Sequence, residues 1–465
     1  MIFGLAQDDV EQVIDVTRGR APGVTNDPRF TELQRKQVDD FLIWGFIDMG
    51  AAWEAIDAFM AESEDDEDMF GEAFDLDGYI AEARQSMDRI TFTVSAHHDG
   101  FIIDIAALRA PGAPAGAGYA WSQPFVSHWA DAVPEDTLLF AAGYDFYGQV
   151  YRPAYDALHT LDLSFTDPYC SSAPLALPGV PAGGEYSETD DPIYGQFYDE
   201  NGEFDFEAFD AWNTEIDARF TLPDGSYDYA GYSEYIDSLY QEACADKRKT
   251  IDDVISEWEQ EVGFDLEDDL LALLTGEFAF ALGARNLEAA EPEIEGAAMA
   301  DVTDPVRADT SLQAIARWLS AEEDVAIDLV ADPRLVELDD DGEYTAAWTT
   351  RPPGGAGQPG HLVLGYPAEY VSSVSEGASD SSLSASGDWQ RTMSLLPPEP
   401  TSIVYVNMAQ LLDEIAGMED AAEEFEDATD GRMQLEDLEP IRSVALATSN
   451  IEDGQAMRVL VLIDN

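Results

Sequence analysis

The chain has 465 residues, and its 96 acidic and 22 basic residues give it a formal net charge of −74. This length favours two or three domains, and a composition that is 45% hydrophobic and 11% aromatic is rich enough for packed cores. A surface this negative repels nucleic acid, so we expect no nucleic-acid partner, and the longest apolar runs are too short to predict a transmembrane segment in this chain.

The first predicted elements are a strand, a helix and a hairpin. Residues 41–47 form a short apolar run typical of a buried strand, and the hydrophobic spacing within 52–59 predicts an amphipathic helix after it. Alternating residues on both sides of Asp99-Gly100 predict a β-hairpin over 90–107.

A segment rich in proline, glycine and alanine separates these elements from the next ones. Residues 111–132 are predicted to be a linker because they open with Pro-Gly-Ala-Pro-Ala-Gly-Ala-Gly. The second module, 133–465, is expected to begin with a strand over 133–142. It contains an irregular insertion at about 165–240, rich in aromatic residues and aspartate, with one short helix at 204–216.

The rest of the second module is predicted to mix strands with helices. A helix over 262–274 has Asp265 as its expected N-cap and acidic residues in its first turn. The other predicted elements up to residue 386 are strands at 277–282, 296–302 and 361–365, helices at 305–319 and 369–374, a hairpin about Asp341-Gly342 and a mobile serine-rich loop at 372–386. A strand at 402–406, a helix at 411–415 and a hairpin over 443–463 complete the chain.

These last elements repeat the first ones in the same order. Asp48-Met49 matches Asn407-Met408 at a shift of 359 residues, and Asp99-Gly100 matches Asp453-Gly454 at a shift of 354. The sequence therefore predicts an α+β fold of two related modules of mainly antiparallel sheet with packed helices, in which residues 1–110 are the carboxy-terminal half of the first module. We expect an upstream portion to be missing; a degenerate terminal half-module is the alternative.

The two cysteines, Cys170 and Cys244, flank the aromatic part of the insertion. A disulfide between them is predicted if the compartment is oxidising, and two buried thiols are predicted otherwise. Neither cysteine lies in a Cys-x-x-Cys motif, so nothing favours a zinc or thioredoxin-like site.

Five segments carry a resemblance to a known family: 134–142, 263–282, 300–305, 360–371 and the final hairpin. Together and in this order they resemble the bacterial family known as domain of unknown function 3352. The resemblance implies two modules outside the cytoplasmic membrane, usually after an amino-terminal signal or membrane anchor. The chain differs from that pattern in having no anchor and in its larger insertion. The family has no established activity, so the resemblance implies no catalytic residues.

No motif in the sequence predicts a catalytic, cofactor-binding or metal site. The histidines lack the spacing of zinc ligands and are expected to be structural or exposed: His97, His98, His128, His159 and His361. Turns such as Asp339-Asp-Asp-Gly342 resemble part of a calcium loop but lack the bidentate acid that such a loop needs at its last position. Nucleotide-binding glycine motifs and a nucleophile elbow are absent from the sequence.

The preferred hypothesis is therefore a non-catalytic protein of the cell envelope, located outside the cytoplasmic membrane, that acts as a binding or scaffold module. A protein or another envelope component would be its partner, and its acidic surface would bind divalent cations weakly. One alternative is a hydrolase with its site near the 165–240 insertion. Another is a cytosolic protein of a salt-accumulating organism, because molar salt screens the repulsion of such a surface.

Overall fold

The computed structural model describes thirteen continuous stretches of the chain and a few single positions between them. The stretches are 41–50, 87–110, 123–160, 204–223, 225–244, 251–285, 293–322, 326–337, 345–353, 359–377, 381–416, 434–451 and 454–464. All structural statements below refer to these residues.

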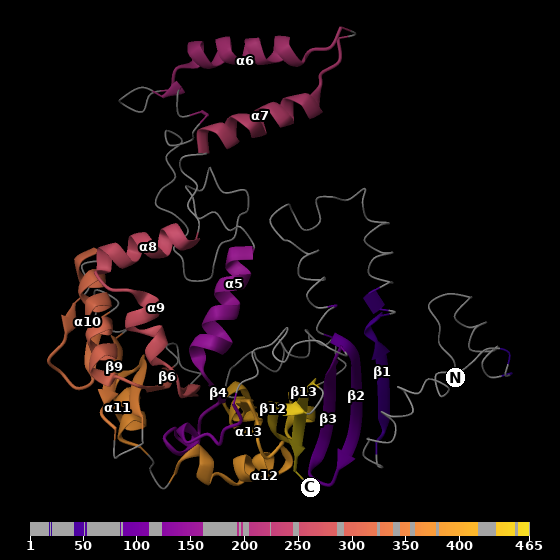
Figure 1. The fold of residues 1–465 in the computed structure, drawn as a ribbon, viewed down its shortest axis with the longest axis vertical. Coiled ribbons are helices and arrows are strands. Elements are labelled where there is room, and N and C mark those ends of the chain that lie inside the picture. The colour runs from indigo at the N-terminus through magenta and orange to yellow at the C-terminus, as the bar shows by residue number, and fades with distance from the viewer. Residues whose placement is uncertain are drawn as a thin grey trace. The chain divides into compact units, whose positions relative to one another are not determined.

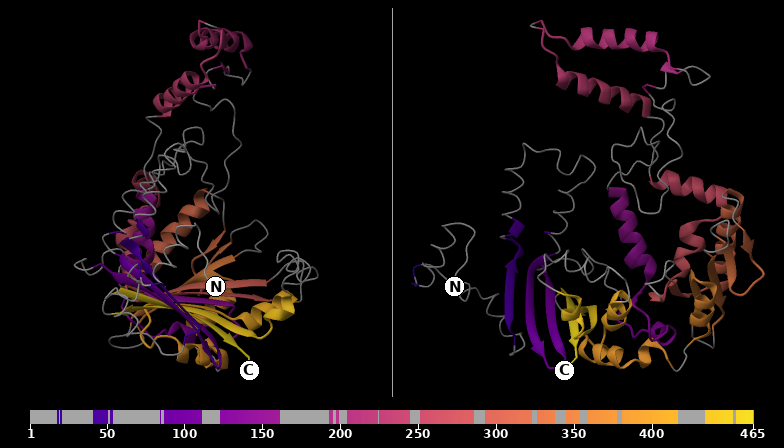
Figure 2. Two further views of the ribbon diagram at one scale, coloured as in Figure 1. Left: turned by 90° about the vertical axis from the view of Figure 1, so that its right-hand side faces the viewer. Right: turned by 180° about the vertical axis from the view of Figure 1, so that it is seen from behind.

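The described strands form one 13-stranded sheet in which every neighbouring pair is antiparallel (Figure 1). Its order is β1-β2-β3-β13-β12-β11-β4-β5-β6-β10-β9-β8-β7. The strands are β1 (Ile43–Asp48), β2 (Met87–His97), β3 (Gly100–Arg109), β4 (Leu139–Tyr144), β5 (Glu277–Arg285), β6 (Glu293–Val302), β7 (Ile327–Asp328), β8 (Arg334–Glu337), β9 (Thr345–Arg351), β10 (Gly360–Tyr366), β11 (Ser402–Val406), β12 (Ile441–Ile451) and β13 (Gly454–Ile463). Figure 2 shows the strands fanning out through a progressive twist. The predicted α+β class and antiparallel sheet are confirmed.

Helices cover both faces of this sheet. One face packs against α11 (Ala368–Glu376) and α12 (Gly387–Leu395), and its core includes the fully buried Phe140 and Tyr405 with Trp389 of α12 between them. On the opposite face, α10 (Pro305–Glu322) accepts a hydrogen bond from Trp348 of β9, whose indole nitrogen lies 3.1 Å from Asp309. A further helix, α13 (Met408–Ala416), contacts β12. The helices and the sheet together form a layered α+β core.

The chain forms two compact units, which are described separately. The first contains the whole sheet, with residues 1–65, 77–149 and 267–465, and the second contains 66–76 and 150–266. The helices of the second unit are α5 (Arg152–Thr160), α6 (Phe206–Phe220), α7 (Tyr229–Cys244) and α8 (Ile251–Val262). The predicted short helix is thus found as α6, and Asp205 caps it by accepting hydrogen bonds from the backbone of residues 207 and 208.

The strands β1–β3 and β11–β13 pair in the same way, residue for residue. Ile43 pairs with Val94 in the first group, and Ser402 pairs with Thr448 in the second, which is the same pair moved by 359 and 354 residues. The register irregularity in β2·β3 falls at 87–89, and the one in β12·β13 falls at 441–443, again 354 residues later. Two groups of strands from distant parts of the chain therefore share a register and a bulge position.

The two groups meet where β3 pairs with β13, and the centre of that junction is an ion pair. Asp104 lies opposite Arg458, and the guanidinium donates to both carboxylate oxygens, at 2.7 Å and 3.1 Å. The third donor, Nη1, reaches the carbonyl oxygen of Leu395 at 2.8 Å. Because the register is antiparallel, Gly100 and Gly454 lie at the two ends of the junction, and a Cβ on either would meet a backbone carbonyl of the opposite strand within 2.1 Å.

Four local predictions differ from the structure. The strand expected at 133–142 begins later, at Leu139. Before it, Pro134 makes only an isolated bridge with Ser382, and the Thr137 hydroxyl donates to the carbonyl oxygen of Pro134 in a turn. The helix expected over 262–274 is only α9 (Leu266–Asp269) and a short 3-10 turn, since Leu271 and Leu273 turn inward and are buried.

The serine-rich segment 372–386 is not a mobile loop in its described part. Residues up to 376 belong to α11, and Leu383 is fully buried in the core. Ser386 accepts a hydrogen bond from the backbone of Trp389 and caps α12. Similarly, the last ten residues of the predicted linker 111–132 include Phe125 and Trp129, which are buried in the same core because the sheet offers an apolar face to them.

Removing the charge of Asp104 is expected to destabilise the first unit. The Asp104→Asn variant loses the paired acceptor of Arg458 at the β3·β13 junction, and we expect its free energy of unfolding to fall by about 1–2 kcal/mol. Glu399→Gln, at an exposed position, removes one negative charge without that partner and controls for the relief of general repulsion. Urea denaturation of both variants measures the difference, and equal stabilities would contradict the importance of the junction.

Candidate functional site

Three polar side chains lie in a row across neighbouring strands of the sheet. Glu277 is the first residue of β5, Asp301 is near the end of β6, and His361 is near the start of β10. Asp301 pairs directly with His361 in the β6·β10 register, and the backbone N–H of Glu277 donates to the Asp301 carboxylate at 3.1 Å. The sheet itself therefore places these three residues side by side.

His128 completes the group from outside the sheet. It precedes a 3-10 turn, 129–131, in which Trp129 and Ala130 are buried in the core. The Trp129 ring also contacts His361 edge-on, with ring centroids 5.1 Å apart. Burial of Trp129 thus fixes the segment that carries His128 and orients the second imidazole.

Hydrogen bonds connect His128 to both carboxylates. Its Nδ1 lies 2.6 Å from Oε2 of Glu277, and its Nε2 lies 3.3 Å from Oδ1 of Asp301. His361 Nδ1 lies 3.2 Å from the same Asp301 oxygen. Glu277 also accepts hydrogen bonds from the Ser127 hydroxyl and from the backbone N–H of His128. We name these four residues, His128, Glu277, Asp301 and His361, the histidine–carboxylate centre.

The carboxylates of the centre are buried and its histidines are partly open to solvent. The side chains of Glu277 and Asp301 are 4% and 9% exposed, whereas those of His128 and His361 are 43% and 32% exposed. Burial opposes the charged form of His128, but hydrogen bonds and attraction to Asp301 and Glu277 outweigh it and raise the pKa of His128 to about 10. Burial likewise opposes ionisation of Asp301, but hydrogen bonds from His128 and His361 lower the pKa of Asp301 to about 2.

A second group of histidines lies at the turn between β2 and β3. His97 and His98 stack at 4.0 Å, and both approach the carboxylate of Asp99, at 3.5 Å and 2.8 Å. His98 is largely exposed, and this group sits on a surface turn. Its residues are close neighbours in the sequence, unlike those of the histidine–carboxylate centre.

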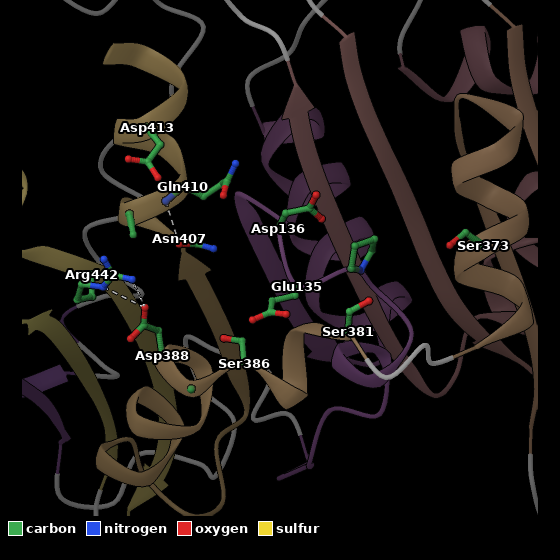
Figure 3. Close-up of a pocket in the computed structure, with 13 residues that line it drawn as sticks. Glu135, Asp136, Ser373, Ser381, Ser386, Asp388, Asn407, Gln410, Asp413 and Arg442 are labelled. Atoms are coloured by element: carbon green, nitrogen blue, oxygen red, sulfur yellow. Dashed lines mark hydrogen bonds and ion pairs between the residues drawn. The ribbon is translucent and has the colours of Figure 1, made fainter. Parts of the chain in front are cut away.

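The first unit also contains an acidic pocket of about 720 Å³ (Figure 3). Glu135 and Asp136 line one side, and Gln410 and Asp413 of α13 line another. The Arg442 guanidinium donates to Asp388 in the wall at 3.0 Å and 3.1 Å, so the positive charge in the lining is neutralised. The pocket therefore presents polar and acidic groups, and no catalytic arrangement is evident among them.

The sequence alone does not predict the histidine–carboxylate centre. The spacing of His128 and His361 fits no metal motif and predicts only structural or exposed roles for them. Glu277, Asp301 and His361 each lie in a segment that carried the family resemblance, namely 263–282, 300–305 and 360–371. Polar residues at the strand ends of those segments are a signal in the sequence, but only the sheet order shows that they are adjacent.

Two other predictions remain untested. Cys170 and the side chain of Cys244 lie outside the described residues, so the disulfide stays a prediction. The described part of the 165–240 insertion is mainly α6 and α7 with packed aromatic rings, such as Phe197 against Phe209 at 5.4 Å. The hydrolase alternative therefore stays a prediction.

Comparison with known proteins gave no relative. Neither a family model, nor a curated protein, nor a solved structure matches the chain. Among the described helices, none is long and apolar enough to cross a membrane.

The raised pKa of His128 predicts how the centre stabilises the fold. A group whose pKa is higher in the folded state stabilises that state fully below its unfolded pKa, about 6.5, and this stabilisation is lost as the pH rises toward 10. In metal-free buffer we expect His128→Gln to lower the free energy of unfolding by about 1 kcal/mol near pH 6, since water screens the partly exposed imidazole. The difference from the unsubstituted protein should shrink by pH 10. A difference independent of pH would contradict this account.

Proposed function

We propose that the protein is a non-catalytic binding or scaffold protein that acts outside the cytoplasmic membrane and contains one α+β module twice, the first copy partial. The observation that carries the proposal is the shared register of β1–β3 and β11–β13. A duplicated segment that keeps its pairing partners and its bulge supports descent of both groups from one module. The resemblance of the sequence to the extracytoplasmic family supports the proposed location.

The strand groups β1–β3 and β11–β13 differ in what pairs with the outer edge of their first strand. This difference suggests a binding surface. The outer edge of β11 is paired with β4, from Ser402·Gly143 to Val406·Leu139. The matching strand β1 is the end of the described sheet, and no described strand pairs with its outer edge. Phe41, Leu42, Ile43 and Ile47 are between 42% and 63% exposed there.

The proposed occupant of this edge is an extended segment of a protein partner that resembles β4. In β4 the large residues Leu139 and Phe140 at one end and Tyr144 at the other flank the small residues 141–143. Since β1 and β11 share their register with the next strand, a segment of this kind would add to β1 as β4 adds to β11. Main-chain hydrogen bonds would supply affinity and the apolar side chains would supply specificity.

A peptide with the sequence of residues 136–145 tests this edge. We expect the labelled peptide to bind the full chain saturably in fluorescence anisotropy, and a scrambled peptide not to bind. Ile47→Lys places a charge on the β1 edge and should weaken binding at least about 10-fold. Val306→Lys, at an exposed position on α10, is the matched control. No saturable binding, or equal binding by both variants, would contradict the binding surface.

The proposed location is tested separately in intact source cells. A membrane-impermeant amine reagent should label the protein before lysis if it lies outside the cytoplasmic membrane, and a known cytosolic protein should stay unlabelled. Labelling only after lysis, with unfolding in dilute buffer that molar KCl reverses, would instead support the cytosolic alternative.

A further inference from the structure

We propose that His128, Asp301 and His361 form a binding site for one divalent transition-metal ion of the zinc type, with Glu277 as a positioning residue. This inference is independent of the proposed partner edge. It rests on the convergence of two imidazoles and one carboxylate in the first unit, outside any motif of the sequence.

The donor atoms have the spacing of a coordination shell. One ligand atom from each of His128, His361 and Asp301 lies within 4.8 Å of the other two. Each nitrogen is 3.2–3.3 Å from the Asp301 oxygen. Ligand atoms of a tetrahedral zinc ion, at about 2.0–2.1 Å from the metal, lie about 3.3 Å apart. A small rotation of the two partly exposed imidazoles toward each other would therefore complete three corners of a tetrahedron.

The surroundings of His128 are those of a metal ligand. A ligating histidine commonly donates its other ring N–H to a carboxylate, which fixes the ring and makes it more basic. In this protein that carboxylate is Glu277, whose Oε2 lies 2.6 Å from Nδ1 of His128. The Ser127 hydroxyl and a backbone N–H hold Glu277 in turn. Glu277 is buried, so its orientation is fixed by the fold rather than by solvent.

The charge of the centre also suits a divalent ion. Asp301 and Glu277 are both buried carboxylates, and a buried charge is costly unless it is paired. The His128 ring lies between them, 2.6 Å from Glu277 and 3.3 Å from Asp301. The two charges of a divalent ion held at this position would balance the two carboxylates.

The donor set selects the class of metal. Two imidazole nitrogens and one carboxylate oxygen suit zinc and its neighbours in the first transition row, whereas calcium and magnesium prefer oxygen ligands alone. The many surface carboxylates of this chain bind any divalent ion weakly, so a specific site must be distinguished from them. Selectivity for zinc over calcium is the property that separates the two kinds of binding.

Zinc titration of the full chain in the presence of millimolar calcium tests the site. We expect calorimetry to show one zinc ion bound tightly by the unsubstituted protein. His361→Gln should lose that binding, and Glu277→Gln should weaken it by about 10–100-fold because His128 loses its orienting partner. His98→Gln, in the exposed group at the β2–β3 turn, is the matched control and should bind zinc as the unsubstituted protein does.

Two measurements keep the test informative if a variant folds poorly. Cobalt bound to the unsubstituted protein should show the strong visible absorption of a four-coordinate site, and zinc should displace it. Zinc should also protect the peptides containing His128 and His361 from modification by diethylpyrocarbonate, while the peptide containing His98 should remain reactive. Zinc binding that calcium abolishes, protection of His98 alone, or loss of the tight site in His98→Gln would each overturn the proposal.

Discussion

The pairing of β3 with β13 is the contact on which the continuity of the sheet depends. Through it, a hairpin from early in the sequence joins strands from its far end, and all thirteen described strands become one surface. Two features of the sequence permit the pairing. A bidentate ion pair lies at its centre, and a glycine lies at each end, where the two backbones approach closely. Leu460 of β13 belongs to the buried core, and Ile102 of β3 packs against it, so the junction also lies against this core.

Charge balance is the second constraint, and it explains where the basic residues lie. The chain has 22 lysines and arginines and five histidines for 96 carboxylates. Arg458, Arg334 and Arg442 each pair with an aspartate inside the first unit. Two buried carboxylates at strand ends, Glu277 and Asp301, pair with histidines instead. In a chain with so many carboxylates, these few basic side chains form structural ion pairs and the histidine–carboxylate centre.

Sequence patterns predicted the strands well and the connections poorly. The Asp99-Gly100 turn and the alternating runs around it identify β2 and β3 because the period of two is a local property. The serines, glycines and prolines around Leu383 and Trp129 predict a mobile loop and a linker, whereas both residues are buried by contacts distant in the sequence. The histidine–carboxylate centre was missed for the same reason, since its four residues come from four segments that only the strand order brings together.

The order of strands has a consequence for how the chain assembles during synthesis. β3 is made early, but its partner β13 follows every other described strand in the sequence. Until then the β2·β3 hairpin exposes a long hydrogen-bonding edge, which is the kind of edge that pairs wrongly with other chains. Pairing over so long a separation is also slow, because a large loop must close first. Asp104 lies in the middle of that edge and pairs with Arg458 once β13 has been made. Before then its charge disfavours pairing of the β3 edge with other chains and so opposes aggregation.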